Sequence, residues 1–226
     1  MEGKTVRQDA SALSVEQIID ALRNQIILGL THLRIGSGLQ KADPVVLQTA
    51  HVFFGFTITA HMQAAQMIAA RLFDKTGGTV NLRLLLRRLK TNPGPLQNGT
   101  SAELRQAIAD AEKKLPILDA SLHSITKRRN KWLAHTAPQT VANPGLLAQE
   151  APITADELER TFKVAGEILN SITNIKAGAT SWFELVDEND FEWVCKLVAD
   201  AKCAQVRAYE AEFDARAPFP RPRDCK

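Results

Sequence analysis

Hydrophobic residues recur three and four residues apart along most of this chain, which is the spacing of one face of an α-helix. The first such run follows Ser14, a predicted N-cap, and we expect it to end where the Gly36–Gly38 segment begins. Asp43 and Pro44 then supply an N-cap and a first helical residue for a helix that should continue to about residue 74.

Helical patterns of the same kind continue towards the C-terminus. Capping boxes pair Thr100 with Glu103 and Thr154 with Glu157, and each pair marks a helix start. Further helices are expected over residues 80–90, 100–115, 116–136, 154–176 and 187–214. No segment alternates with a period of two over any length, so we predict an all-α bundle of about seven helices. We expect one domain over residues 14–216, with a flexible N-terminus at 1–13 and a flexible tail at 217–226.

The stretch Pro44–Ala70 contains no Asp, Glu, Lys or Arg and is long enough to cross a membrane. A polar stripe nevertheless follows one side of the predicted helix, and it consists of Gln48, His51, Thr59, Gln63 and Gln66. Lipid would leave these groups unsatisfied, so we favour a buried bundle helix over a membrane span and expect no membrane partner.

Composition narrows the class of protein only a little. The chain has 226 residues, of which 45% are hydrophobic and 23% charged, as in ordinary globular domains. A net charge of +3 and a pI of about 8.8 are compatible with nucleic-acid binding but do not argue for it. Three cysteines without a C-x-x-C motif favour a reducing compartment, and the polar N-terminus lacks a signal core, so we expect a cytoplasmic protein.

The helix expected over residues 116–136 contains the candidate site. Its apolar face is formed by Leu118, Leu122, Ile125 and Trp132. Arg129 lies on this same face, where burial of a permanent charge is costly unless the charge is paired. His135 closes the helix and Pro138 stops it. An arginine within an apolar stripe and a histidine at the helix end indicate a chemical role.

Arg129-Asn130 followed by Ala134-His135 resembles the signature of the HEPN superfamily, which is an arginine and a histidine separated by four to six residues, with a polar residue after the arginine. The surroundings resemble the abortive-infection branch of the Abi-U type. The matching segments are Arg71–Asp74, Asn81–Leu89 and Ile153–Leu158, and the likeness covers residues 40–175.

The resemblance implies an all-α bundle that forms a symmetric dimer, in which the two motif helices share a cleft. Many such proteins are metal-independent ribonucleases of toxin–antitoxin or phage-defence systems, so RNA and an antitoxin or defence protein are the expected partners. The expected catalytic residues are Arg129, His135 and Asn130, and the expected substrate-binding residues are Arg128, Lys131 and Arg87. No nucleotide fingerprint or metal-ligand cluster is present in the sequence, and we expect no cofactor and no metal.

Metal-free RNA cleavage needs a base for the 2′-OH, an acid for the leaving 5′-oxygen and a cation for the pentacoordinate phosphate. Histidine suits the first two tasks and arginine the third. One imidazole cannot hold both protonation states, so we expect His135 to act together with its copy in a dimer. The helix C-terminus favours the imidazolium form, and Asn130 could orient either phosphate or its helix neighbours.

Two arginines compete for the cationic role. Arg129 and His135 are six residues apart, about 240° on an ideal helix, whereas Arg128 shares a face with His135. We favour Arg129 because Asn130 follows it, and convergence with His135 then needs a tightened last turn or the partner subunit. The structural alternative is that Arg129 pairs with a buried carboxylate such as Asp74 and that His135 only caps the helix.

The other candidates are weaker. The basic edge formed by Arg83, Arg87, Arg88 and Lys90 is either a solvated helix face or a contact for RNA phosphates. His51 could face the cleft, His61 is expected in the core, His32 is expected at the surface or at a helix cap, and His123 precedes the motif by too many turns to join it. Core packing is expected for Cys195 and Cys203.

Three functions are therefore compatible with the sequence. The first is a metal-independent endoribonuclease of defence or growth arrest, and the second is an RNA- or nucleotide-binding module in which Arg129 and the basic edge hold phosphate without turnover. The third is a helical scaffold held by a partner such as an antitoxin.

Overall fold

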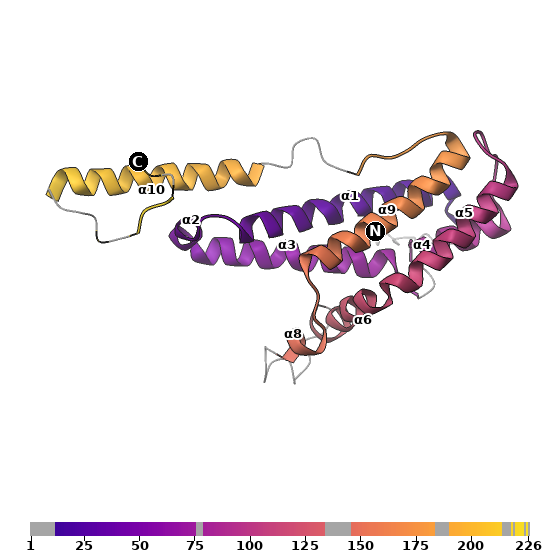
Figure 1. Cartoon of the computed structure of the whole chain (residues 1–226), viewed down its shortest axis with the longest axis horizontal. Helices are drawn as coiled ribbons and strands as arrows, with labels where there is room; N and C mark the ends of the chain where they lie inside the picture. Colours follow the sequence, from indigo (N-terminus) through magenta and orange to yellow (C-terminus); the bar gives the residue numbers. More distant parts are fainter. Residues whose placement is uncertain are drawn as a thin grey trace, which may run out of the picture. The chain divides into compact units, whose positions relative to one another are not determined.

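The structure, a computed structural model, describes residues 12–75, 79–133, 146–183 and 190–213, together with residues 218, 220–223 and 225. Within these ranges the fold is all-α and contains no strand, which confirms the predicted class (Figure 1). The α-helices are α1 (Val15–Gln40), α2 (Pro44–Thr49), α3 (His51–Leu72), α4 (Leu82–Thr91), α5 (Ser101–Lys114), α6 (Asp119–Arg128), α8 (Leu146–Glu150), α9 (Ala155–Ala177) and α10 (Asp190–Phe213). A 3₁₀ turn, η2 (Leu115–Leu118), precedes α6, and a π-helical turn, η3 (Arg129–Leu133), follows it.

The chain forms two compact units. The first comprises Met1–Leu30 and Ala65–Glu184, and the second comprises Thr31–Ala64 and Leu185–Lys226. Both α1 and α3 contain residues of the two units, with the boundaries after Leu30 in α1 and after Ala64 in α3.

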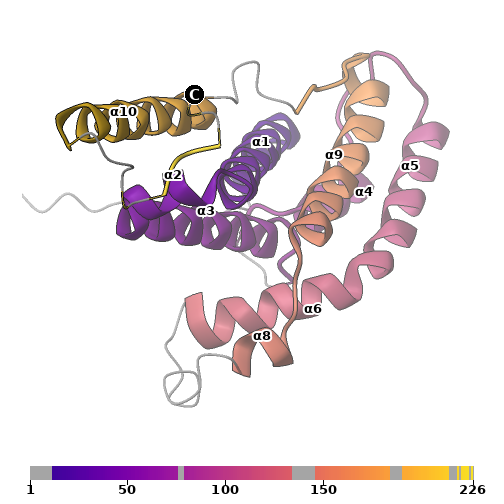
Figure 2. The same ribbon diagram turned by 60° about the vertical axis from the view of Figure 1, so that its left-hand side comes forward.

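The first unit contains α4, α5, α6, α8 and α9, together with Val15–Leu30 of α1 and Ala65–Leu72 of α3. Helices α5 and α9 lie side by side (Figure 2), and α6 also contacts α9. The leucine face of α4 is buried as predicted, and it consists of Leu82, Leu85, Leu86 and Leu89. Phe162 and Leu158 of α9 are fully buried in this unit.

Local capping signals place most helix starts where the sequence predicted them. The Thr100 and Thr154 hydroxyls accept from the backbone N–H groups of Glu103 and Glu157, and both capping boxes are complete. Gly178 ends α9 in the left-handed conformation, with φ of 65°. A glycine is the residue that adopts this conformation at least cost, so the end of α9 is also fixed locally.

The second unit is built from α2, α10, the end of α1 and the start of α3. Its hydrophobic cluster contains Leu39, Val46 and Phe54, against which Phe191 and Cys195 of α10 pack. Cys203 is buried, as predicted for a core residue. In the described part of the C-terminal tail Pro222 is buried, and the Arg223 backbone N–H donates to Asp43 Oδ2 at 2.6 Å.

Helix α1 does not end at Gly36–Gly38, and the prediction of its terminus was wrong. The helix continues to Gln40. A Cβ on Gly38 would lie 2.3 Å from the Phe191 ring, and one on Gly36 would lie 2.9 Å from Met62 Sδ. These glycines lie inside the helix and leave room for the side chains of Met62 and Phe191 to pack closely against it. The sequence pattern alone does not distinguish this role of glycine from helix termination.

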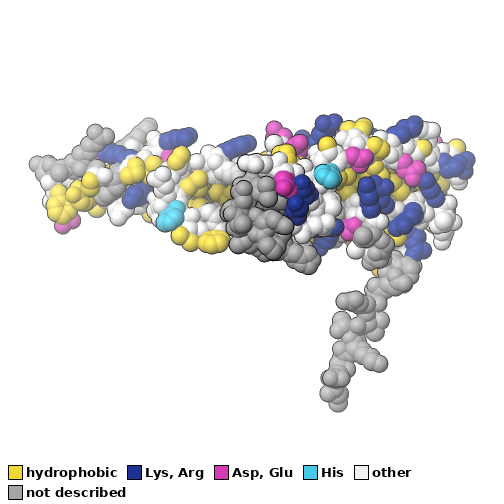
Figure 3. Space-filling model, turned by 90° about the horizontal axis from the view of Figure 1, so that it is seen from below, with side chains coloured by type: hydrophobic (Ala, Val, Ile, Leu, Met, Phe, Trp, Pro, Cys, Tyr) yellow, Lys and Arg dark blue, Asp and Glu magenta, His cyan; other side chains and the backbone are white. Residues whose placement is uncertain are grey.

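The single long helix expected from Pro44 is divided at Ala50, where the backbone leaves the helical region at φ −138° and ψ 55°. The second half of α3 is largely buried, but its first half exposes Val52 by 58%, Phe53 by 60% and Phe56 by 74%. Hydrophobic side chains gather on the surface of the second unit (Figure 3). Of the helices that the structure describes, none is sufficiently long and apolar to cross a membrane.

Candidate catalytic cavity

The helix that carries the Arg129 motif is described from Leu115 to Leu133, and it consists of the three segments η2, α6 and η3. Leu115–Leu118 forms a 3₁₀ turn because Pro116 cannot donate within a helix, and α6 then buries Leu122 and Ile125 against the first unit's core. From Arg129 the turn widens to the π form. The tightened last turn that would bring Arg129 towards His135 lies partly outside the described residues, and the described part of the chain there is widened. His135 lies outside the described residues.

Arg129 is held by two contacts. Its Nη1 lies 3.3 Å from Asp74 Oδ2, and its Nε donates to Asn130 Oδ1 at 3.0 Å. The side chains of Arg129 and Asp74 are 22% and 13% exposed, so the ion pair is well shielded from water. The pairing considered as a structural alternative is therefore present, and Asn130 orients its own neighbour. The Nη2 group of Arg129 has no hydrogen bond to any residue that the structure describes.

Arg129 lines a cavity of about 610 Å³. The remaining wall consists of Ala70, Phe73, Asp74, Lys75, Asp119, Ala120, Leu122, His123 and Thr126. His123, Thr126 and Arg129 follow one another at intervals of three along the helix, so they project from the same side. His123 was expected to lie too many turns before the motif to join it, but it lines the same cavity as Arg129. The spacing of three was the signal that could have identified it.

Arg128 and Lys131 do not line this cavity. Arg128 Nε donates to the Ala151 backbone oxygen at 2.6 Å, and burial lowers the pKa of its guanidinium. Glu150 lies 2.8 Å from Lys131 and 3.0 Å from Lys127, and hydrogen bonds from these two lysines lower the pKa of its carboxyl group. Both predicted substrate-binding residues therefore attach the motif helix to α8 and the segment after it. Between the two arginines, the geometry favours Arg129 for contact with a ligand.

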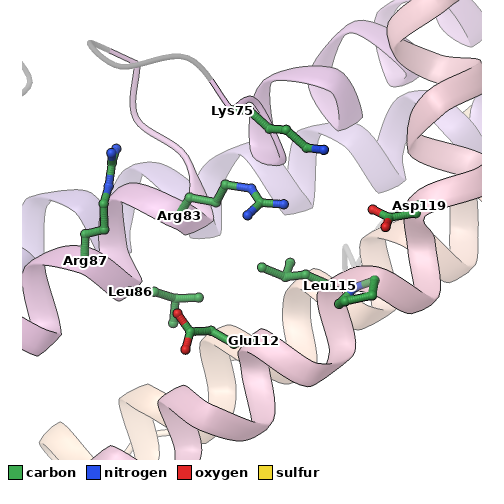
Figure 4. Close-up of a pocket in the computed structure, with 8 residues that line it drawn as sticks. Lys75, Arg83, Leu86, Arg87, Glu112, Leu115 and Asp119 are labelled. Carbon is green, nitrogen blue, oxygen red and sulfur yellow. The ribbon is translucent and has the colours of Figure 1, made fainter.

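Arg87 lies apart from Arg129, at an exposed position on α4. It lines a second cavity of about 420 Å³ (Figure 4). Lys75 and Asp119 line both cavities, so the two adjoin each other. The described residues contain no group of three or more His, Cys, Asp or Glu side chains arranged to hold a metal ion.

A helical bundle in which the arginine of an R-N-x₄-H motif lines a cavity is the arrangement expected of a HEPN protein. The family model HEPN AbiU2, described as AbiU2, matches residues 13–194, and the chain belongs to this family. The match extends beyond residues 40–175, over which the resemblance was first drawn, and includes all of α1. No protein of curated function and no solved structure gives a match.

Proposed function

We propose that this protein is a metal-independent endoribonuclease of a phage-defence or toxin-type system. It cleaves RNA through the 2′-OH, with Arg129 and His135 as the central residues and with two copies of the chain forming the site. The observation that carries the proposal is the state of Arg129, which is mostly buried, oriented by Asp74 and Asn130, and adjacent to a cavity large enough for part of a nucleotide.

In this mechanism Arg129 acts on the phosphate. Asp74 and Asn130 hold its Nη1 and Nε, which leaves Nη2 for a non-bridging phosphate oxygen. Because the guanidinium is oriented before substrate binds, it can stabilise the charge that develops on the pentacoordinate phosphorus without first reorganising. One His135 accepts the 2′-OH proton and its copy donates a proton to the leaving 5′-oxygen, which yields a 2′,3′-cyclic phosphate and a 5′-OH.

The decisive experiment incubates the purified protein with a mixed RNA pool in EDTA. Wild type should give fragments that end in 2′,3′-cyclic phosphate, whereas His135→Ala and Arg129→Lys should lose cleavage by roughly two orders of magnitude or more. Arg129→Lys is preferred to an alanine variant because lysine keeps a positive charge opposite Asp74 and loses only the planar fork. Arg160→Ala, an exposed position on α9, is the matched control and should cut like wild type.

Full cleavage by His135→Ala would overturn the proposed role of that residue. His123→Ala should then be tested in the same assay, because His123 lies on the wall of the Arg129 cavity. The molar mass from light scattering tests the dimer, and a purely monomeric protein that still cuts RNA would contradict a site shared by two copies.

A non-catalytic RNA-binding module is the second candidate, and the cavity lined by Lys75, Arg83 and Arg87 favours it, since cationic side chains hold phosphate without any need for turnover. This function predicts salt-sensitive binding of RNA with no cyclic-phosphate product under any condition.

A further inference from the structure

The cavity next to the Arg129 site is lined by three cationic side chains. Lys75, Arg83 and Arg87 all contribute to its wall (Figure 4), and none of them makes an ion pair within the parts of the chain that the structure describes. The Arg83 Nε is buried and has no hydrogen-bond acceptor among the residues that the structure describes. A buried N–H donor is normally satisfied, so this one indicates that an acceptor is still to be supplied.

The wall contains two acidic residues, which are fewer than its three cations. Both carboxylate oxygens of Glu112 accept from Lys90 Nζ, at 2.7 and 2.8 Å. Asp119 is the other carboxylate, and Figure 4 shows the Arg83 guanidinium and the Lys75 ammonium directed into the space in front of it. The cavity wall therefore retains an excess of positive charge.

The arrangement on α4 also carries a cost that a bound anion would relieve. Arg83 and Arg87 are four residues apart, and like charges at this spacing repel each other and destabilise a helix. Arg87 lies at the rim, where Figure 4 shows its side chain extended away from the centre of the cavity. An anion beside Arg83 would attract both side chains at once.

We propose that Lys75, Arg83 and Arg87 form a phosphate-binding subsite for the RNA strand, in the cavity that adjoins the Arg129 cavity. A guanidinium fork matches the oxygens of a phosphodiester, and Leu86, Leu115 and Pro116 provide an apolar floor for the attached nucleotide. The two cavities share Lys75 and Asp119, so one strand can occupy both. The choice of RNA as the ligand rests on the proposed function, whereas the anion site itself rests on the geometry described above.

The test measures binding without cleavage. A fluorescent 2′-O-methyl oligoribonucleotide, which lacks the attacking hydroxyl, is titrated with each variant over a range of KCl concentrations, and affinity is read from anisotropy. Arg83→Gln and Lys75→Gln should each weaken binding by about tenfold and lower the slope of log affinity against log salt by roughly 1. Asp119→Asn removes a negative charge from the wall and should strengthen binding by roughly twofold to fivefold.

Arg105→Gln is the matched control, because Arg105 is an exposed arginine on α5 that lines neither cavity. Wild-type affinity and salt slope in both Arg83→Gln and Lys75→Gln would overturn the subsite, even if wild type cuts RNA in the separate EDTA assay. Weakened binding in both variants, together with tighter binding by Asp119→Asn, would support it whether or not cleavage is observed. A wild-type protein that neither binds nor cuts RNA would overturn the subsite and the proposed function together.

Discussion

Arg129 makes an ion pair that supports the fold, and in the proposed mechanism it also contacts the phosphate. Its ion pair with Asp74 joins η3 to the end of α3, two segments that are far apart in the sequence. Burial of a charge is tolerated only where a partner is present, so the pair explains why an arginine can occupy an apolar helix face. What separates this arginine from Arg128 is its place in the wall of the cavity, since Arg128 does not line it and its Nε donates to the Ala151 backbone oxygen.

At the same scale, His32 and His61 form a pair that should make stability depend on pH. Their Nδ1 atoms are 2.9 Å apart. Burial lowers the pKa of both rings, and the charge of His32 lowers the pKa of His61 further. The folded state therefore binds fewer protons than the unfolded state, in which each pKa is about 6.5. The folded state therefore keeps its full stability above about pH 6.5. It loses stability as the pH falls from there through the lowered pKa values of the two folded-state rings.

Urea unfolding of wild type, followed by circular dichroism, should accordingly show a lower free energy of unfolding at pH 5 than at pH 7. His61→Asn removes one titrating ring, and its loss of stability over the same interval should be smaller. An equal loss in the two proteins would show that other groups cause the pH dependence.

At the scale of elements, replacing a helical glycine by alanine should lower the stability of the protein at Gly29 and raise it at Gly55. A Cβ on Gly29 of α1 would lie 2.3 Å from the ring of Phe162, which is fully buried. Gly29→Ala should therefore lower the free energy of unfolding by about 1–2 kcal/mol, because overpacking outweighs the gain in helix propensity.

Gly55→Ala is the matched control for this prediction. Gly55 lies within α3, and no atom lies within 4 Å of a Cβ built there, so the substitution should raise stability by about 0.5–1 kcal/mol through helix propensity alone. Denaturant unfolding of the two variants measures both effects. Stabilisation by both would mean that Phe162 can be accommodated elsewhere.

Elements whose signals are local could be predicted from the sequence, and those set by distant contacts could not. The capping boxes at Thr100 and Thr154 involve residues three positions apart, so the start of each helix is contained in a short stretch of chain. The glycines near the end of α1 were misread because Phe191, which packs against Gly38, is far along the sequence. His123 was missed for a related reason, since the cavity wall also includes Asp74 and Lys75, which follow α3.

At the scale of the whole molecule, the two units have cores of very different size. Among the described residues, the buried hydrophobic side chains of the second unit are Leu33, Leu39, Val46, Phe54, Cys203 and Val206, and the first unit contains the remainder. Local opening is easier where little apolar surface is buried. We therefore expect hydrogen exchange to be faster in α2 and α10 than in α5 and α9.

Helices α1 and α3 provide an internal control for the exchange measurement. Each should show two rates within one continuous helix, with protection falling after about Leu30 in α1 and before about Ala65 in α3. Mass spectrometry of peptides from exchanged protein resolves the halves. Protection in α10 equal to that in α9 would show that the smaller core is stabilised by a further contact, such as a second copy of the chain.

The π-helical turn at Arg129–Leu133 has a consequence for how the motif tolerates changes in length. A π turn contains one more residue than the α turn that it replaces, so a chain can gain or lose a residue there by converting one form into the other. Deletion of one residue between Arg129 and Leu133 would restore α-helical winding while α6 and its buried face stay in place. The HEPN motif allows four to six residues between its arginine and its histidine. A turn that can change between the π and α forms is a place where this difference in length can be accommodated.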